Sequence, residues 1–250
     1  MIYKDIHTFL KDYDKDNVIF CYGNNAVVNL VGNLMLSAKK VGVSVVLFAL
    51  DEKISDGMKD KCDVVNYFDL EVEPDKFYEY GTEEYKKVVW QRFFIGLKIL
   101  KSGKSYIYMD VDIVVRKNFE NEVLNKLFYR DDIDCVIQGF KLFPLLKELG
   151  CTGFFAMKPT ERTLNITFEY FKENNYMDYT DDERFFNKII MKRKVLNIRI
   201  LNANAYPTGP NYYINYAEIK NTCRIVHFNG IVGYDTKINR MKKFNLYNNG

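Results

Sequence analysis

The sequence predicts an α/β protein in which a mostly parallel central sheet is covered by helices. Over the first half of the chain, short apolar runs typical of buried strands alternate with segments of helical periodicity. Such alternation is typical of parallel sheets, because each connecting helix crosses back over one face of the sheet. The chain contains no internal repeat and no low-complexity linker. We therefore predict a single domain over residues 1–250, regular to about residue 115 and mixed from about residue 116 onward.

The first half predicts four strands and three helices. The strands are expected at residues 18–21, 43–50, 64–65 and 106–109. The helices are expected at residues 26–40, 53–61 and 83–101, where apolar residues recur with helical spacing. The last helix has the clearest limits, because Thr82 can cap its first turn and Gly103 suits its exit.

The second half is less regular. Strands are expected at residues 136–140, 153–157, 195–201 and 224–228, and helices at residues 160–173 and 181–192. Thr180 and Glu183 have the spacing of a capping box at the start of the second helix. The tail at residues 237–243 is basic, and we expect it to be exposed.

Composition excludes several classes of function. The net charge of +3 is too small to indicate a nucleic-acid partner. The sequence has no apolar run long enough to span a bilayer, and its first residues lack the apolar core of a signal peptide. The five cysteines are scattered without a C-x-x-C pair, which is typical of reduced thiols. We therefore expect a cytoplasmic protein without a transmembrane segment.

Two carboxylates interrupt the apolar run at residues 106–115. Asp110 and Asp112 would point to the same side of an extended segment, at the end of a predicted strand where open α/β sheets bind ligands. Burying both is costly unless a cation compensates their charge. The pair therefore predicts a site for Mn²⁺ or Mg²⁺ and a phosphate group. The alternative is a turn in which Asp110 caps backbone amides and Asp112 is solvated.

His227 lies at the end of another apolar run and is followed by Asn229 and Gly230. Imidazole is a common ligand of transition metals, Mn²⁺ included. A single histidine on an apolar strand is, however, also typical of a core histidine whose hydrogen bonds are satisfied. The residues alone leave both interpretations open.

Two motifs suggest other ligands and are rejected. Gly103-Lys104-Ser105 is similar to the end of a P-loop, but Lys98 stands where the first glycine belongs and the triplet ends a helix. The first strand is followed by Tyr22-Gly23-Asn24-Asn25 and not by G-x-G-x-x-G. A nicotinamide or flavin cofactor therefore has no support.

Four motifs in this order resemble the GT-A-fold nucleotide-diphospho-sugar transferases, over roughly residues 18–237. The first is a helix that contains Arg92, where the family usually has a lysine, followed by a strand that ends in the Asp110-x-Asp112 pair. The second is the segment at residues 151–160, which resembles an acceptor-side strand of the family. The third, at residues 182–187, resembles a D-Q-x-x-L-N motif. The fourth is His227 to Gly230, with Gly233 and Lys237 behind it.

The resemblance implies a GT-A-like fold with a Rossmann-like sheet, and a transferase that moves a sugar from a UDP-sugar to a hydroxyl acceptor with retention. The acceptor would be a glycan, glycolipid or protein. Residues to about 115 would bind the nucleotide, and residues from about 116 the sugar and acceptor. Asp110, Asp112 and His227 would hold the metal, Mn²⁺ or Mg²⁺. The residues implied to bind the nucleotide sugar are Tyr22, Asn24, Asn25, Arg92, Asp110, Val111, Gly153, Gly230 and Lys237.

Further roles follow from the same resemblance. Tyr22, Asn24 and Asn25 would lie by the nucleobase and ribose, and Lys237 would neutralise the departing diphosphate. Asp110 and Asp182 would be the catalytic acids, with Asp182 binding sugar hydroxyls. On spacing alone, Asp182 is equally well explained as an acid at a helix N-terminus.

The chain also departs from the family pattern. Glu183 stands in place of the usual glutamine, so the sugar contacts are expected to differ. Residues 116–118 read Arg-Lys-Asn in place of the usual aspartate and proline after the strand. Many members carry a membrane anchor, whereas this sequence shows none, which fits a bacterial or viral pathway in the cytosol.

Two other functions remain open from the sequence. A strand that ends in Asp-Val-Asp-Ile-Val also resembles the nucleophile motif of haloacid-dehalogenase-like phosphatases, with Asp110 as the nucleophile. The third possibility is a non-catalytic protein that binds a nucleotide sugar without turnover.

Overall fold

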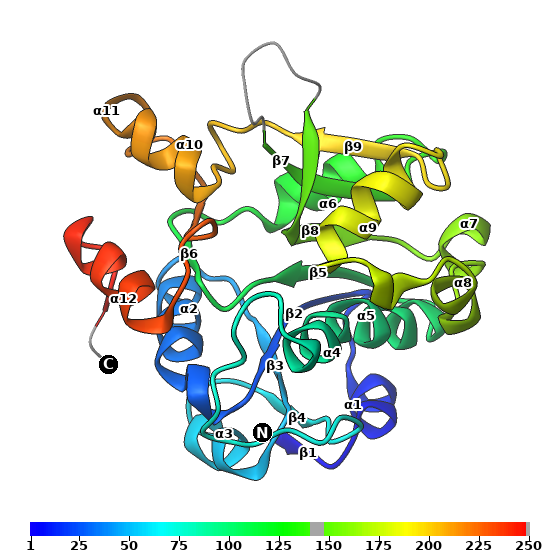
Figure 1. Cartoon of the computed structure of the whole chain (residues 1–250), viewed down its shortest axis with the longest axis horizontal. Coiled ribbons are helices and arrows are strands. Elements are labelled where there is room, and N and C mark those ends of the chain that lie inside the picture. Colours follow the sequence, from blue (N-terminus) through cyan, green and yellow to red (C-terminus); the bar gives the residue numbers. More distant parts are fainter. Residues whose placement is uncertain (141–147, 249–250) are drawn as a thin grey trace.

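The computed structural model describes residues 1–140 and 148–248, so residues 141–147 and 249–250 of the predicted domain lie outside the described residues. One eight-stranded sheet runs through the molecule with helices on both faces (Figure 1). In spatial order its strands are β1 (Ile2–Tyr3), β4 (Val64–Asn66), β3 (Val46–Ala49), β2 (Asn17–Gly23), β5 (Ser105–Met109), β8 (Leu149–Met157), β7 (Cys135–Phe140) and β9 (Ile198–Leu201). Neighbouring strands are parallel except where β8 runs antiparallel to β5 and β7, which confirms the predicted mostly parallel sheet.

A second, two-stranded sheet lies at the edge where β5 ends. It consists of β6 (Ile113–Val115) and β10 (Ile225–His227), which pair antiparallel with His227 opposite Ile113. Because β6 follows β5 after a short turn, this pairing brings the end of the chain to the carboxyl end of a central strand.

The helices divide between the two faces of the large sheet. They are α1 (Ile6–Asp12), α2 (Val28–Lys40), α3 (Glu52–Met58), α4 (Glu83–Val89), α5 (Gln91–Lys101), α6 (Glu120–Phe128), α7 (Glu161–Leu164), α8 (Phe168–Glu173), α9 (Asp182–Phe185), α10 (Gly209–Ile214), α11 (Tyr216–Ile219) and α12 (Tyr234–Lys243). Phe20 of β2 belongs to the core with α1 and α5, whereas its neighbours Ile19 and Cys21 belong to the core with α2, α3 and α6. Successive strand residues point to opposite faces, so one strand serves both cores.

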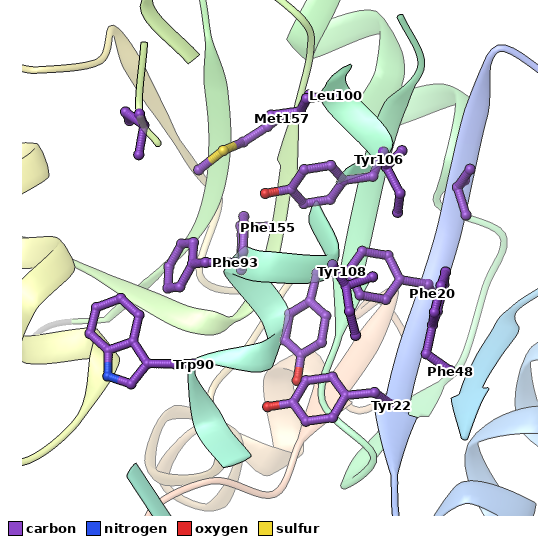
Figure 2. Close-up of a cluster of buried hydrophobic side chains, with 14 of the residues drawn as sticks. Phe20, Tyr22, Phe48, Trp90, Phe93, Leu100, Tyr106, Tyr108, Phe155 and Met157 are labelled. Atoms are coloured by element: carbon purple, nitrogen blue, oxygen red, sulfur yellow. The ribbon is translucent and has the colours of Figure 1, made fainter. Parts of the chain in front are cut away.

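Aromatic side chains fill the core on the α5 face (Figure 2). Phe20 contacts the rings of Tyr106 and Tyr108, with centroids 5.6 and 5.3 Å apart. Trp90 is fully buried and packs on Phe171 and Phe185 at 5.2 and 5.1 Å. Trp90 also divides the helix predicted at residues 83–101 into α4 and α5, because its ψ of −15° interrupts the regular turn.

The second half departs further from the predicted elements. Residues 160–173 form two short helices, α7 and α8, because Thr160 and Thr167 each cap a separate start. The predicted helix at residues 181–192 begins as α9 and continues as a π-helix, Phe186–Met191. The capping box of Thr180 and Glu183 is wrong, since the Asp181 side chain accepts from the Arg184 N–H. Helices and strands absent from the prediction are β1, α1, β6, α6, α10, α11 and α12.

The basic tail expected to be exposed at residues 237–243 is exposed only in part, at Asn239, Lys242 and Lys243. Residues 234–243 form α12, whose Ile238 and Met241 are buried in a third core with Tyr212 and Phe228. This helix lies beside α2 and β6 (Figure 1). Across residues 1–140 and 148–248, none of the helices has the length and apolar character needed to cross a bilayer.

We predict opposite effects for two Gly→Ala changes in helices. A Cβ on Gly96 would lie 2.6 Å from Cζ of Tyr106, so Gly96→Ala should lower the free energy of unfolding by about 1–3 kcal/mol through overpacking. A Cβ on Gly32 in α2 would meet open space, so Gly32→Ala should raise the free energy of unfolding by about 1 kcal/mol. Urea unfolding of both variants measures the difference. Equal effects would contradict the close packing of α5 on β5.

Candidate active site

Asp110 and Asp112 lie in the turn between β5 and β6. The Asp110 N–H donates to the Gly153 carbonyl (2.8 Å), and the Ile113 N–H donates to the Asp110 carbonyl (3.2 Å). The expected extended segment is therefore wrong at these two positions: the turn, not the strand pleat, directs both side chains to one place. Asp112 is 3% exposed, which also excludes the solvated alternative.

His227 completes the group from the facing strand. Its Nε2 lies 3.3 Å from Oδ2 of Asp110 and 3.2 Å from Oδ1 of Asp112. One ligand atom from each of the three residues lies within 4.8 Å of the other two. The pairing of β10 with β6 produces this convergence, since it sets His227 beside the residue that follows Asp112.

The group has unsatisfied polar atoms. Nε2 of His227 and Oδ1 of Asp112 are buried and have no hydrogen-bond partner among the described residues. Leaving buried polar atoms unpaired is costly. A proton on Nε2 or a metal ion between the three side chains would satisfy them. Two carboxylates and an imidazole are ligands that suit Mn²⁺, so the residues present fit such an ion. The interpretation of His227 as a satisfied core histidine does not fit this geometry.

Two cationic side chains flank the acids. Lys237 Nζ lies 2.6 Å from Oδ2 of Asp112. Arg92 lies between two carboxylates, with Nη2 3.2 Å from Asp110 Oδ1 and Nε 3.4 Å from Asp182 Oδ2. Asp182 is 2% exposed, so its carboxylate faces Arg92 and not open solvent. Both cations come from helices, Arg92 from α5 and Lys237 from α12.

Tyr108 supports the same arrangement from β5. Its hydroxyl donates to Asp110 Oδ1 (2.5 Å), and the Arg92 guanidinium lies over its ring, 4.9 Å from the centroid. Tyr22 stacks on Tyr108 at 5.7 Å. Tyr108, which belongs to the aromatic core of Figure 2, thus connects that core to Arg92 and Asp110.

Burial and charge act in opposite directions on the acids. Burial raises the pKa of Asp112, but Lys237 and His227 outweigh it and leave that pKa well below its usual value. Asp110 behaves in the same way: burial raises its pKa, and Arg92 and His227 bring it below the usual value. For Asp182, burial dominates over the opposing effect of Arg92 and raises the pKa to about 6. The two acids nearest His227 therefore stay ionised far below neutral pH, whereas Asp182 takes up a proton near pH 6.

The glycine at position 153 leaves space at the centre of the group. A Cβ there would collide with the ring of His227 and would lie 2.5 Å from Oδ2 of Asp110. Gly230 and Gly233, in the loop between β10 and α12, have φ of +70° and +92°, a region that favours glycine. Val111 is half-buried in the turn between the two acids and packs on the neighbouring cores.

Tyr22, Asn24 and Asn25 lie where β2 ends, as predicted, but their polar atoms have partners. Nδ2 of Asn24 donates to the carbonyls of Glu73 and Lys76. Nδ2 of Asn25 donates to Asp75, and the Tyr22 hydroxyl donates to the Val89 carbonyl. These contacts fasten the segment at residues 73–76 over the end of β2. Binding of a nucleobase there stays a prediction.

A cavity of about 1190 Å³ opens beside α9 and the π-helix. Glu183 is half-buried in its wall, together with Asp181, Tyr179 and Asn187. Burial raises the pKa of Glu183 to about 7, partly offset by a hydrogen bond with Cys151. The cavity thus carries an acid whose pKa lies near neutrality.

Sequence reasoning missed two polar residues of the site. Tyr108 lies two positions before Asp110 on an apolar strand, and Gln138 is the single amide in the apolar run of β7. Gln138 is fully buried, and its Oε1 lies 2.9 Å from Nδ1 of His227. In both cases a polar group inside an otherwise apolar strand was the signal available in the sequence.

Comparison with known proteins identifies the family. Residues 42–241 match the nucleotide-diphospho-sugar transferase family, and the chain belongs to it. The chain is 22% identical over 200 residues to the UDP-galactose:fucoside alpha-3-galactosyltransferase of Dictyostelium discoideum, a match covering 67% of this chain and 29% of that protein. It is 25% identical over 189 residues to a UDP-D-xylose:L-fucose alpha-1,3-D-xylosyltransferase of Arabidopsis thaliana, covering 68% and 52%. The chain therefore spans about half or less of the length of these relatives.

Solved structures share the fold. A glycosyltransferase involved in the glycosylation of the major capsid of PBCV-1 matches with a TM-score of 0.56 at 11% identity, over 92% of this chain and 100% of that one. Apo mouse xyloside xylosyltransferase 1 matches with a TM-score of 0.55 at 10% identity, over 88% and 100%. The GT-A-like fold implied by the four motifs is thereby confirmed.

We predict that the stability contribution of Glu183 falls as pH rises. Its pKa of about 7 lies above the ordinary value of 4.5, so the folded state binds more protons between those limits. Stability then decreases from pH 4.5 to 7. Glu183→Gln removes this loss, and its unfolding free energy should exceed that of the wild type by roughly 1–3 kcal/mol at pH 8 but not at pH 4.

Glu122→Gln is the matched control with the opposite sign. Burial raises the pKa of Glu122, but Lys126 and Arg224 outweigh it and lower that pKa below its ordinary value. This group stabilises the fold above its ordinary pKa, and the contribution is lost as pH falls, so Glu122→Gln should be the less stable protein at pH 8. Urea unfolding across pH measures both variants. A Glu183→Gln difference that does not change with pH would contradict the burial of that acid.

Proposed function

We propose that this chain is a metal-dependent glycosyltransferase that moves a sugar from a UDP-sugar to a hydroxyl group of a glycan. The observation that carries the proposal is the buried group of Asp110, Asp112 and His227 at the carboxyl end of β5. Open α/β sheets bind their ligands at this edge. Membership of the nucleotide-diphospho-sugar transferase family supplies the class of donor.

The charged side chains have different roles in this proposal. Asp110, Asp112 and His227 would hold Mn²⁺ or Mg²⁺, which when bound acts as a Lewis acid beside a diphosphate. Lys237, which is held against Asp112, places a positive charge where the leaving diphosphate accumulates negative charge. Arg92 fixes the direction of Asp110 and Asp182, and its contact with Tyr108 prevents it from swinging away.

The remaining residues are assigned by their place around this centre. Gly153 leaves the space in which the sugar diphosphate meets the ligand group, because any side chain there would fill it. Asp182 is proposed to bind sugar hydroxyls, and Val111 and Gly230 to line the path of the diphosphate. Tyr22, Asn24 and Asn25 would bind nucleobase and ribose after the segment at residues 73–76 adjusts. Residues to about 115 then serve the nucleotide, and later residues the sugar and acceptor.

The names of the relatives suggest donor, acceptor and stereochemistry. Both use a UDP-sugar, act on a fucose unit and form an alpha linkage. UDP-galactose and UDP-xylose are themselves alpha-linked, so such products retain configuration. By analogy we propose a UDP-hexose or UDP-pentose donor, a fucose-containing acceptor and retention. The cavity beside Glu183 is large enough for a sugar acceptor and opens next to the proposed sugar site.

The two other functions have less support. A phosphatase nucleophile must be free to attack phosphorus, but Asp110 is held by Tyr108, Arg92 and His227. Family membership also argues against this class. A binding protein without turnover shares the same site, so only catalysis separates it from a transferase.

We predict a rise in melting temperature that needs both a metal and a nucleotide. UDP-galactose and UDP-xylose with Mn²⁺ should stabilise the wild type, because a ligand that binds only the native state raises its melting temperature. GDP-mannose should not. Asp112→Asn should not show the rise in melting temperature that needs both Mn²⁺ and a UDP-sugar. The rise is measured for each protein from its own melting temperature without ligand.

Asp56→Asn is the matched control, because this acid on α3 is exposed and does not belong to the ligand group. It should keep the full shift. The proposed metal would be refuted if Asp112→Asn showed the same rise in melting temperature as the wild type. It would also be refuted if a UDP-sugar raised the melting temperature equally with and without Mn²⁺.

We further predict transfer to a fucoside with an alpha linkage in the product. Wild-type protein, Mn²⁺ and the donor selected by the melting experiment should glycosylate a methyl fucoside, and NMR of the product reports the anomeric configuration. Asp112→Asn should lower the turnover by about 100-fold or more, since it weakens the charge stabilisation at the leaving group. Donor binding without transfer to any sugar acceptor would favour the binding protein, and a beta product would refute retention.

A further inference from the structure

The imidazole of His227 has two sides, and only one faces the acids. Nε2 points to Asp110 and Asp112, at 3.3 and 3.2 Å. Nδ1 points away from them, into the interior between β7 and β8. A neutral imidazole carries its proton on one nitrogen and a lone pair on the other. Whether Nε2 can serve as a metal ligand therefore depends on what Nδ1 meets on the opposite side.

Gln138 meets Nδ1 in an orientation that its other contact determines. Its amide nitrogen Nε2 donates to the Tyr206 carbonyl at 3.0 Å. A carbonyl oxygen can only accept, so the –NH₂ group must lie on that side. The atom that faces His227 Nδ1 at 2.9 Å is then the amide oxygen Oε1, which can only accept. The proton of a neutral imidazole must therefore be on Nδ1, which leaves the lone pair on Nε2 when no second proton is bound.

We propose that Gln138 is a positioning residue of the metal site, because its side-chain oxygen holds His227 in the tautomer whose Nε2 lone pair faces Asp110 and Asp112. This inference rests on the metal site of the proposed function. Metal-bound histidines commonly donate their second N–H to such an acceptor, which fixes the ring and increases its basicity. Gln138 contacts no proposed substrate group and acts only through His227.

The neighbourhood of Gln138 makes the contact rigid. Gln138 is 0% exposed, and the Tyr206 that anchors it is also 0% exposed and stacks on Phe154 of β8. The pairing of β7 with β8 shifts register at this point, from Ile137 with Phe155 to Gln138 with Cys151. Such bulges commonly re-aim side chains beside active sites.

Cys151 is the other side chain near Nδ1, and it is the weaker partner. Its Sγ lies 3.7 Å from Nδ1, whereas the oxygen of Gln138 lies at 2.9 Å. Sulfur is a weak acceptor, and this one already accepts from Nδ2 of Asn229 at 3.4 Å. The orientation of the ring is therefore assigned to Gln138.

Binding of Mn²⁺ alone tests the proposal without reference to transfer. The loss of the free Mn²⁺ signal in electron paramagnetic resonance gives the dissociation constant. Gln138→Met keeps the length of the side chain but removes the acceptor, and should weaken binding by about 10- to 100-fold. Gln138→Glu keeps an oxygen acceptor toward Nδ1 when its other oxygen is protonated and donates to the Tyr206 carbonyl, and it should then bind Mn²⁺ within about threefold of the wild type.

Thr163→Val is the control for a buried polar group lost elsewhere. Thr163 is fully buried on α7, and its hydroxyl donates to the Lys158 carbonyl. This variant should lose stability but bind Mn²⁺ like the wild type. If Gln138→Met binds Mn²⁺ as tightly as the wild type, Gln138 has no positioning role.

NMR on the wild type supplies a measurement that needs no variant to fold. The chain has two histidines, and His7 is exposed on α1. The imidazole ¹⁵N signals that do not belong to His7 are therefore those of His227. With Mg²⁺ bound, we expect the proton on Nδ1; a proton on Nε2 overturns the inference. Failure of the wild type to bind Mn²⁺ in a manner that depends on Asp112 would overturn the proposed metal site, and this inference with it.

Discussion

The negative charge buried at the carboxyl end of β5 is the constraint on which the rest of the site depends. Three carboxylates, those of Asp110, Asp112 and Asp182, face two cationic side chains, Arg92 and Lys237. One negative charge is left over in a region nearly closed to water, where an unpaired charge is very costly. The unsatisfied Nε2 of His227 marks the place where the missing positive charge belongs, on a proton or on a metal. A cation there stabilises the fold and prepares the site for an anionic ligand through the same interaction.

The topology explains why these groups meet although they lie far apart in sequence. β5 delivers the acids, the antiparallel β8 places Gly153 against them, and β10 returns to pair with β6 and brings His227. α12 then packs its apolar face on the third core, which turns Lys237 toward Asp112. Because strands and buried helices carry these residues, little reorganisation is needed when charge develops.

Much of this was predictable from sequence, and the misses have physical causes. The acid pair and the central strands are local patterns, so reading along the chain finds them. The break at Trp90 is not local, since it follows from packing on Phe171 and Phe185. Helix α12 was not predicted because lysines and an arginine dominate the composition of residues 237–243. Ile238 and Met241 nevertheless have the spacing of one helix face. The partners of Asn24 and Asn25 depend on a segment about fifty residues later, which no spacing rule predicts.

The aromatic core explains why a buried arginine can serve two acids. Arg92 donates to the carbonyls of Val89 and Thr152 and lies over the ring of Tyr108. A guanidinium presents five donors in a fixed plane, so it can bind Asp110 and Asp182 while these other contacts hold it. Burial would otherwise favour neutral acids, and the raised pKa of Asp182 shows that Arg92 compensates this acid only in part. Asp110 lies nearer to Arg92 and His227 and stays ionised. Arg92 therefore compensates the two acids unequally. Asp110 stays ionised and available to a cation, whereas Asp182 can exchange a proton near neutrality.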